Sequence, residues 1–258
     1  MTINDATDAY YCTNNNAELI RIFVIRHGQT EHNVKKILQG QTDTSINTRG
    51  RSQALKLGEY LGEQGIKFDK VVSSDLKRCR ETVECILGES TRLGCVDADT
   101  DADMDADVDV EFTEKFRERF MGPLEGLHVS EAEKYVARHQ DESGLGSGSG
   151  SGSKSWGDFG EKIASFNERV TNALAEVVRD AEENDLRNVA VVSHGGAIRA
   201  LLRFVDPSTG AHQKIVVFNT SVTIIDYVVA TKQLVLREIG NTRHLGNGTF
   251  VVSDLRLR

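Results

Sequence analysis

The stretch IRIFVIRHG (residues 20–28) decides the fold, because an apolar run of Ile, Phe and Val ends abruptly in Arg, His and Gly. A continuous apolar strand bounded by Gly is typical of a strand buried on both faces of a parallel sheet. A second run, NVAVVS (residues 188–193), has the same character and is followed by His194 and Gly195. The sequence therefore predicts two buried strands that each end in His-Gly.

Helical and strand patterns alternate around these two runs. Further helices are predicted over residues 49–64, 75–87, 157–183 and 195–204, and further strands over residues 70–74, 215–218, 222–229 and 234–239. A Ser or Asp at the start of the 75–87 segment is the expected N-cap. This alternation predicts an α/β fold in which helices cover both faces of a mainly parallel sheet, a three-layer α/β/α sandwich. Ligands of such sheets bind beyond the carboxyl ends of the strands, where both His-Gly pairs fall.

One domain over residues 18–258 is expected, after a polar, disordered tail of residues 1–17. Two low-complexity insertions interrupt it: an acidic run at 97–109 and a Gly/Ser segment at 144–153. The acidic run resembles a calcium loop in its Asp spacing, but Val108 occupies the position that requires Gly. We interpret it as a solvated acidic loop.

Composition excludes several classes of partner. The net charge is −8, and seven Asp of the run at 97–109 account for most of it, so the rest of the chain shows no basic face. We therefore expect neither nucleic-acid nor membrane binding. No apolar run approaches 18 residues, and the polar start lacks the features of a signal peptide. The expected location is the cytoplasm, with the nucleus also open, and nothing in the sequence indicates the oligomeric state.

The cysteines and histidines show no metal-ligand spacing. Cys12, Cys79, Cys85 and Cys95 form no CxxC pair, so they are expected to be free thiols. No metal and no cofactor are predicted.

The residues at the strand ends suit phosphoryl transfer, which needs a nucleophile, fixed positive charge and an acid for the leaving oxygen. Arg26 and His27 supply a cation and a nucleophile, and Gly28 would let the backbone approach a ligand. Asn33 can donate an amide hydrogen bond, and the Arg78 guanidinium can hold two phosphate oxygens.

The second strand end adds further donors. His194 can donate to a third oxygen, with the Gly195 amide beside it at a helix N-terminus. The acid is then expected in the segment FRER, where Glu118 is the candidate, although Glu111, Glu114 and Glu125 lie nearby.

At this point the chain resembles the histidine phosphatase superfamily in its phosphoglycerate-mutase-like branch. The resemblance covers about residues 20–258, and its motifs follow in family order: RHGQTEHN (26–33), LQGQTDTSINTRGRSQA (38–54), SSDLKRCRET (73–82), FRERFMGPLEG (116–126) and VVSHGGAIR (191–199). Fungal broad-specificity phosphatases and fructose-2,6-bisphosphatase-like phosphatases look most similar. The resemblance implies the phosphoglycerate-mutase-like form of the α/β/α sandwich.

The resemblance also implies a role for each matching residue. His27 would be the nucleophile that becomes phosphohistidine, and Glu118 would protonate the leaving oxygen and then deprotonate water. The phosphoryl group would be held by Arg26, Asn33, Arg78 and His194. The pocket would be lined by Gln39, Gly40, Gly195 and Gly196. No metal is implied, and the partner would be a small phosphorylated substrate.

Differences between this sequence and the motifs of other branches of the family narrow the range of activities that the resemblance implies. The acid phosphatase branch looks like RHGxRxP with a late His-Asp pair, whereas this chain has Thr30 and His194-Gly195. Mutases carry a Pro-containing basic insertion and usually a Tyr where Met121 stands, so water is the expected phosphoryl acceptor. The expected function is a metal-independent phosphatase of phosphate monoesters, with a phosphoglycerate-type mutase as one alternative. The other alternative, a non-catalytic binding module on the same fold, should have lost His27, Arg78 or His194.

Overall fold

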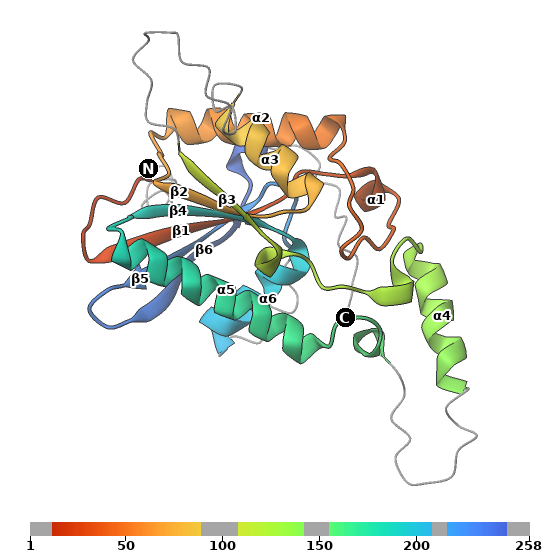
Figure 1. Ribbon diagram of the computed structural model, residues 1–258. Coiled ribbons are helices and arrows are strands. Elements are labelled where there is room, and N and C mark those ends of the chain that lie inside the picture. Colours follow the sequence, from red (N-terminus) through yellow and green to blue (C-terminus); the bar gives the residue numbers. More distant parts are fainter. Residues whose placement is uncertain (1–11, 89–107, 142–154, 208–215, 247–258) are drawn as a thin grey trace, which may run out of the picture.

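A six-stranded sheet forms the centre of the molecule in the computed structural model, which describes residues 12–88, 108–141, 155–207 and 216–246 (Figure 1). The strand order is β3-β2-β4-β1-β5-β6. The strands are β1 (Leu19–Arg26), β2 (Lys70–Ser74), β3 (Asp109–Thr113), β4 (Asn188–Ser193), β5 (Val222–Val228) and β6 (Gln233–Asn241). The first four strands in this order pair in parallel, and β5 is antiparallel to both of its neighbours. The predicted mainly parallel sheet is confirmed.

Helices cover both faces of this sheet. In Figure 1, α2 (Thr48–Glu63) and α3 (Lys77–Leu87) lie on one side, and α5 (Ile163–Glu183) and α6 (Gly195–Val205) lie on the other. Alternating residues of β1 supply both cores: Ile22 and Val24 join the α5–α6 side, whereas Phe23 and Ile25 join the α2–α3 side. Successive strand residues point to opposite faces, so an apolar run is what a doubly covered strand requires. The three-layer α/β/α arrangement is thereby confirmed.

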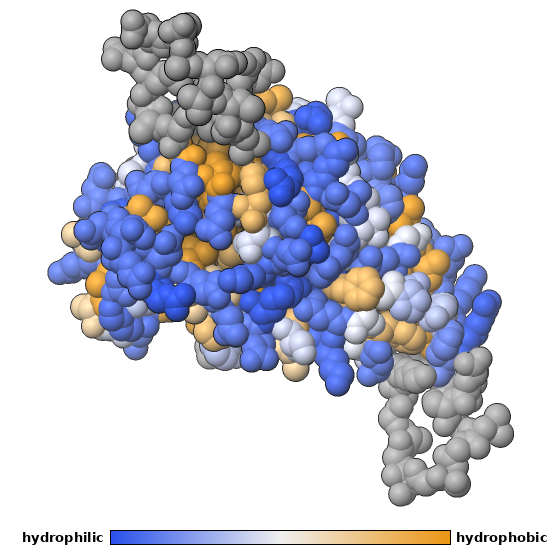
Figure 2. All heavy atoms as spheres, in the orientation of Figure 1, coloured by the Kyte–Doolittle hydropathy of each residue, from blue (hydrophilic) through white to orange (hydrophobic). Residues whose placement is uncertain are grey.

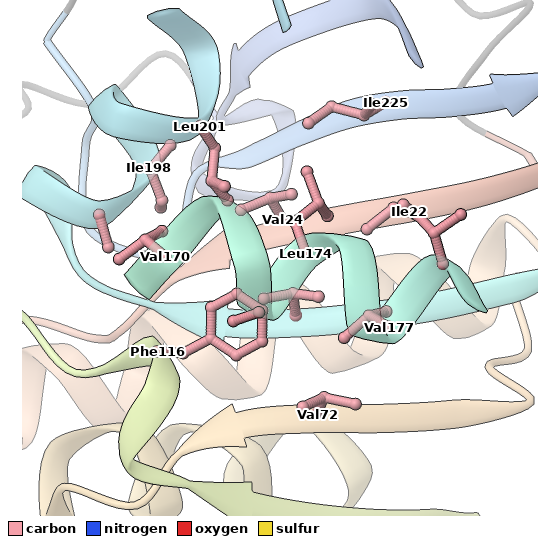
Figure 3. Close-up of a cluster of buried hydrophobic side chains, with 14 of the residues drawn as sticks. Ile22, Val24, Val72, Phe116, Val170, Leu174, Val177, Ile198, Leu201 and Ile225 are labelled. Atoms are coloured by element: carbon pink, nitrogen blue, oxygen red, sulfur yellow. The ribbon is translucent and has the colours of Figure 1, made fainter. Parts of the chain in front are cut away.

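The larger core lies between the sheet and the helices α5 and α6 (Figure 3). Its labelled members are Ile22, Val24, Val72, Phe116, Val170, Leu174, Val177, Ile198, Leu201 and Ile225. Truncation of one such fully buried side chain to Ala costs about 2–5 kcal/mol. This packing holds the N-terminus of α6 against the end of β4.

A third, smaller cluster lies away from the sheet. It joins α4 (Val129–Asp141) to Leu38 and to the segment after β3. Ala132 and Val136 contribute from the helix, and Met121 and Leu124 from that segment. The four-residue helix α1 (Glu31–Val34) follows β1 directly. These elements build a wall beyond the carboxyl ends of the parallel strands.

The predicted starts of two helices are wrong. Helix α3 begins at Lys77, and its N-cap is Leu76 without a side-chain hydrogen bond, because the Asp75 carboxylate instead accepts two hydrogen bonds from Arg117, at 2.7 and 2.5 Å. Helix α5 begins at Ile163, not 157, since Gly160 has a left-handed φ of +72° that interrupts a helix.

The acidic insertion ends earlier than predicted. Asp109, its last predicted residue, is the first residue of β3 and pairs with Lys70 of β2. Residues 97–107 and the Gly/Ser segment 144–153 lie outside the described residues. Both β3 and α4 were missed by the sequence analysis, and residues 216–218 of the predicted strand 215–218 form no strand.

The predicted tail of residues 1–17 is also too long. Asn14 is buried, and its backbone N–H donates to Asn188 Oδ1 at 2.7 Å while its amide donates to Leu19 O at 2.7 Å. The packed chain therefore begins before residue 18. Residues 1–11 lie outside the described part of the chain.

The surface is mostly hydrophilic on the face drawn in Figure 2, where hydrophobic side chains gather only in small groups. Among the described residues, no helix combines the length and hydrophobicity needed to span a membrane. Cys12, Cys79 and Cys85 are free thiols as predicted. Cys95 lies outside the described residues.

Candidate active site

The two predicted histidines meet because β1 and β4 are parallel and end in register. Arg26 pairs with Ser193, and the His27 N–H donates to Ser193 O at 2.9 Å. The rings of His27 and His194 consequently lie with their centroids 5.2 Å apart. Both imidazoles are buried.

His27 has the form that a nucleophile needs. Its Nδ1 lies 2.7 Å from Gly28 O. A carbonyl oxygen only accepts, so Nδ1 carries the proton and Nε2 keeps its lone pair. Burial, followed by the charges of Arg78 and Arg26, holds the pKa of His27 well below 6.5. The imidazole is therefore neutral and nucleophilic at neutral pH.

Arg78 is the largest fully buried side chain, and protein groups fix its orientation. Its Nε donates to His194 Nδ1 at 3.1 Å, and its terminal nitrogens donate to Thr42 O and Gly40 O, each at 2.8 Å. A guanidinium has five N–H groups, so two remain for a ligand. Arg26 is anchored separately, through a 2.5 Å hydrogen bond to Val217 O.

His194 is held differently from what the sequence suggested. Because Arg78 donates to Nδ1, the proton lies on Nε2, which is 2.9 Å from Ser74 Oγ. Burial, then the charge of Arg78, lowers the pKa of His194 well below 6.5, so the ring is neutral. Both nitrogens thus bond to protein groups, and donation to a phosphoryl oxygen requires His194 to exchange one of these partners.

The carboxylate of Glu118 lies at the N-terminus of α6. Its Oε2 accepts from the Gly196 N–H at 2.7 Å, and its Oε1 accepts from the Arg119 N–H at 2.9 Å. Glu125, the nearby alternative, instead accepts from Gln41 N and Thr42 Oγ1 at 2.9 and 3.1 Å. Glu125 therefore stabilises a loop, and the geometry favours Glu118 as the acid.

Two amides present donors to the site. Asn33 Oδ1 accepts from Thr30 N at 3.1 Å in a capping box, and Gln39 Oε1 accepts from the hydroxyls of Thr30 and Thr44 at 3.0 and 2.6 Å. Because both oxygens are engaged, the amide NH₂ groups are left to donate. Gly40 has a φ of +49°, and its carbonyl accepts from Arg78.

A single cavity of about 350 Å³ brings these groups together. All predicted site residues except one line it: Arg26, His27, Asn33, Gln39, Gly40, Arg78, Glu118, His194, Gly195 and Gly196. Gly28 is the exception, and its predicted role stays a prediction. A Cβ at Gly28 would lie 2.7 Å from Gly50 O, so this glycine permits packing against α2.

Sequence analysis missed three supporting residues. Ser74 bonds His194, and Thr82 Oγ1 accepts from the Gly28 N–H at 2.9 Å. Asn219 donates to His27 O at 2.9 Å. Ser74 and Thr82 stand within the motif SSDLKRCRET, which could have indicated them, whereas no local pattern indicates Asn219.

The fold and the site together define a class: an α/β/α protein whose cavity gathers two buried histidines, two arginines and a carboxylate. A profile of the histidine phosphatase superfamily (branch 1) matches residues 22–240. The chain belongs to this superfamily.

Known proteins support the same placement. A broad-specificity phosphatase of Saccharomyces cerevisiae is 50% identical over 249 residues, which cover 96% of this chain and 97% of the relative. A phosphoglycerate mutase-like protein of Arabidopsis thaliana is 30% identical over 233 residues, 90% of each chain. The crystal structure of a Bacillus anthracis phosphoglycerate mutase superposes with a TM-score of 0.69 at 24% identity, covering 88% of this chain and 96% of that one. Within the superfamily, the chain is a phosphatase.

Proposed function

We propose that the protein hydrolyses small phosphate monoesters in two steps, through a phosphohistidine formed on His27. The observation that carries this proposal is the Nδ1 hydrogen bond of His27 to Gly28 O, which leaves Nε2 as the nucleophile of a neutral ring. Arg26, Arg78 and the amide of Asn33 line the cavity around it. These donors would hold the three phosphoryl oxygens.

In the first step, His27 Nε2 attacks phosphorus and the ester oxygen leaves. A protonated Glu118 gives its proton to that oxygen, so the alcohol departs neutral. The two fixed arginines stabilise the charge that spreads over the phosphoryl oxygens. The products of this step are the free alcohol and phosphohistidine.

In the second step, water replaces the alcohol. The Glu118 carboxylate accepts a proton from the water as its oxygen attacks phosphorus, and the bond to Nε2 breaks. Inorganic phosphate leaves, and His27 and protonated Glu118 are regenerated. One carboxyl group therefore serves both steps, which requires it to be held at one place by the amides of Gly196 and Arg119.

A trapping experiment tests the histidine. Wild-type protein mixed briefly with phosphate-labelled substrate and quenched in base should carry an acid-labile label. His27→Ala should carry none and retain less than about a thousandth of the wild-type rate. His128→Ala, on the surface and bonded to Ser130, is the control and should label normally. A labelled, active His27→Ala variant would refute the proposal.

The substrate range is part of the proposal. The name of the yeast relative, a broad-specificity phosphatase, supports several small phosphate monoesters as substrates. The cytoplasmic or nuclear location, and the expected lack of nucleic-acid and membrane partners, stay predictions.

A further inference from the structure

The segment that contains Glu118 is neither a strand nor a helix. It follows the short 3₁₀ helix η1 (Glu114–Phe116), which lies beside α5, and residues 117–121 have irregular backbone (Figure 1). The carbonyl groups of a partly buried, irregular segment need hydrogen-bond donors from elsewhere in the fold. The place of an acid on such a segment therefore depends on where those donors come from.

Arg169, on α5, supplies them from a single side chain. Its Nη1 donates to the carbonyl oxygens of Glu114, Lys115 and Arg117, at 3.2, 2.9 and 3.0 Å. Its Nη2 donates to Glu118 O at 3.4 Å. One guanidinium therefore binds the main chain of the acid and of three residues before it.

Glu161 orients this guanidinium. Arg169 Nε and Nη2 donate to the two carboxylate oxygens of Glu161 at 2.9 and 2.8 Å, and such bidentate pairs are strong and directional. The Glu161 carboxylate also accepts from the Phe120 N–H at 3.3 Å, while the Glu161 N–H donates to Phe120 O at 2.8 Å. Both side chains of the pair are mostly buried, with 23% and 18% of their surface exposed. The pair thus contacts the main chain before and after Glu118.

The contacts of Arg169 leave it no part in binding a ligand. Its six hydrogen bonds use all five N–H groups of the guanidinium. Among the described residues that line the cavity, neither Arg169 nor Glu161 is present. What the pair can affect is the distance between the segment and α6, and Glu118 Oε2 reaches the Gly196 N–H, at 2.7 Å, across that distance.

We propose that Arg169, oriented by Glu161, is a positioning residue that holds the main chain of the catalytic acid Glu118 against α6. We call this pair the acid clamp. The inference rests on the proposed function, in which Glu118 protonates the leaving oxygen. Without the guanidinium, four carbonyl oxygens lose a donor, and the carboxylate moves with its main chain away from Gly196.

Two kinds of leaving group separate positioning from general stability. The ratio kcat/KM covers the steps up to departure of the alcohol, in which an alkyl oxygen needs the acid and an aryl oxygen does not. We expect Arg169→Gln to lower kcat/KM about 100-fold for an alkyl phosphate, the cost of a catalytic group misplaced by about 1 Å, and less than about tenfold for an aryl phosphate. Arg169→Lys keeps the charge without the planar fork, so it should lose nearly as much. Equal losses on both substrates, or full activity in Arg169→Lys, would overturn the acid clamp.

Arg179→Gln is the matched control, because Arg179 is exposed on the same helix and its loss removes the same charge. It should keep full activity on both substrates. In the Glu118→Gln background, Arg169→Gln should cause no further loss on the alkyl phosphate, since no acid remains to be positioned; multiplied losses would overturn the proposal. If Arg169→Gln does not fold, Glu161→Gln is the second variant, and its loss should again fall mainly on the alkyl phosphate.

The amide proton signal of Gly196 gives a readout without turnover. Because this N–H donates to Glu118 Oε2, its NMR signal should move in Arg169→Gln toward its position in Glu118→Ala, and stay in place in Arg179→Gln. An unmoved signal in Arg169→Gln would overturn the acid clamp. If wild type hydrolyses neither substrate, the proposed function fails, and this signal still decides whether the clamp holds Glu118.

Discussion

Gly196→Ala should disable the acid without altering any reacting group. The Gly196 N–H, which alanine keeps, donates to Glu118 Oε2 at 2.7 Å. An added Cβ would lie 2.1 Å from Glu118 Oε1. An ordinary carbon–oxygen contact is about 3.5 Å, so the carboxylate must retreat by on the order of 1 Å. The end of a glutamate side chain can move, so the fold should survive the substitution.

The size of the effect follows from that displacement. Misplacement of a catalytic group by about 1 Å costs roughly 100-fold in rate. An alkyl phosphate, whose leaving oxygen needs a proton, should therefore lose about 100-fold in kcat. An aryl phosphate leaves without that proton and should lose far less. Steady-state assays with both substrates, together with a melting temperature for each variant, measure the difference.

Gly62→Ala is the matched control. Gly62 also lies in a helix, but a Cβ there would meet nothing within 4 Å. This variant should keep full activity and gain up to about 1 kcal/mol in stability, because alanine favours the helix. Equal losses on alkyl and aryl phosphates in Gly196→Ala, at unchanged melting temperature, would refute the argument that Gly196 provides space for the acid.

Four further predictions concern the same site. Glu118→Gln should slow the hydrolysis of alkyl phosphates by about 10²–10⁴ and that of aryl phosphates much less. Glu125→Gln should lower the melting temperature and affect the hydrolysis of both substrates alike. The reverse pattern would make Glu125 the acid. Burial, and then the charge of Arg78, hold the pKa of His27 below 6.5. The acid limb of the pH profile of kcat/KM should therefore lie below pH 6.5 in wild type and move to higher pH in Arg78→Gln. An acid limb above pH 6.5 in wild type would contradict this prediction. The same shift means that the folded state binds fewer protons than the unfolded one, so stability should fall as pH drops below about 6.5. Activity should survive exhaustive dialysis against EDTA, and a loss restored by a divalent cation would count against the histidine mechanism.

The strands and helices that carry the active site were predictable because their patterns are strong. The apolar run of β1 and the 3.6-residue periodicity of α2 reflect burial, which determines both sequence and position. β3 was missed for the opposite reason. It is an edge strand whose residues are half exposed or exposed, and its sequence DVEFT continues the acidic character of the run before it. Charged edge strands give little hydrophobic signal.

The identities of the site residues were also predictable, but not how each is held. Motif order pointed to Glu118, and only the three-dimensional contact with Gly196 distinguishes it from Glu125. The partners of His194 could not be foreseen, because Ser74 and Arg78 reach it from a strand and a helix more than 100 residues earlier. Gly28 has an explanation that the sequence did not suggest: a Cβ there would lie 2.7 Å from Gly50 O, so packing against α2 already requires a glycine at this position.

The paired ends of β1 and β4 also determine where the chain can change in length. Arg26 faces Ser193 in the ladder, so each histidine is the next residue beyond a matched pair. One residue added to either strand would shift its histidine by about 3.3 Å and reverse the face on which it lies. The hydrophobic character of the strand could survive such an insertion, but the pairing of the two rings could not. The low-complexity segments of this chain, at 97–107 and 144–153, fall instead between α3 and β3 and between α4 and α5. Both segments therefore lie in connections where added residues would not change the register of β1 and β4.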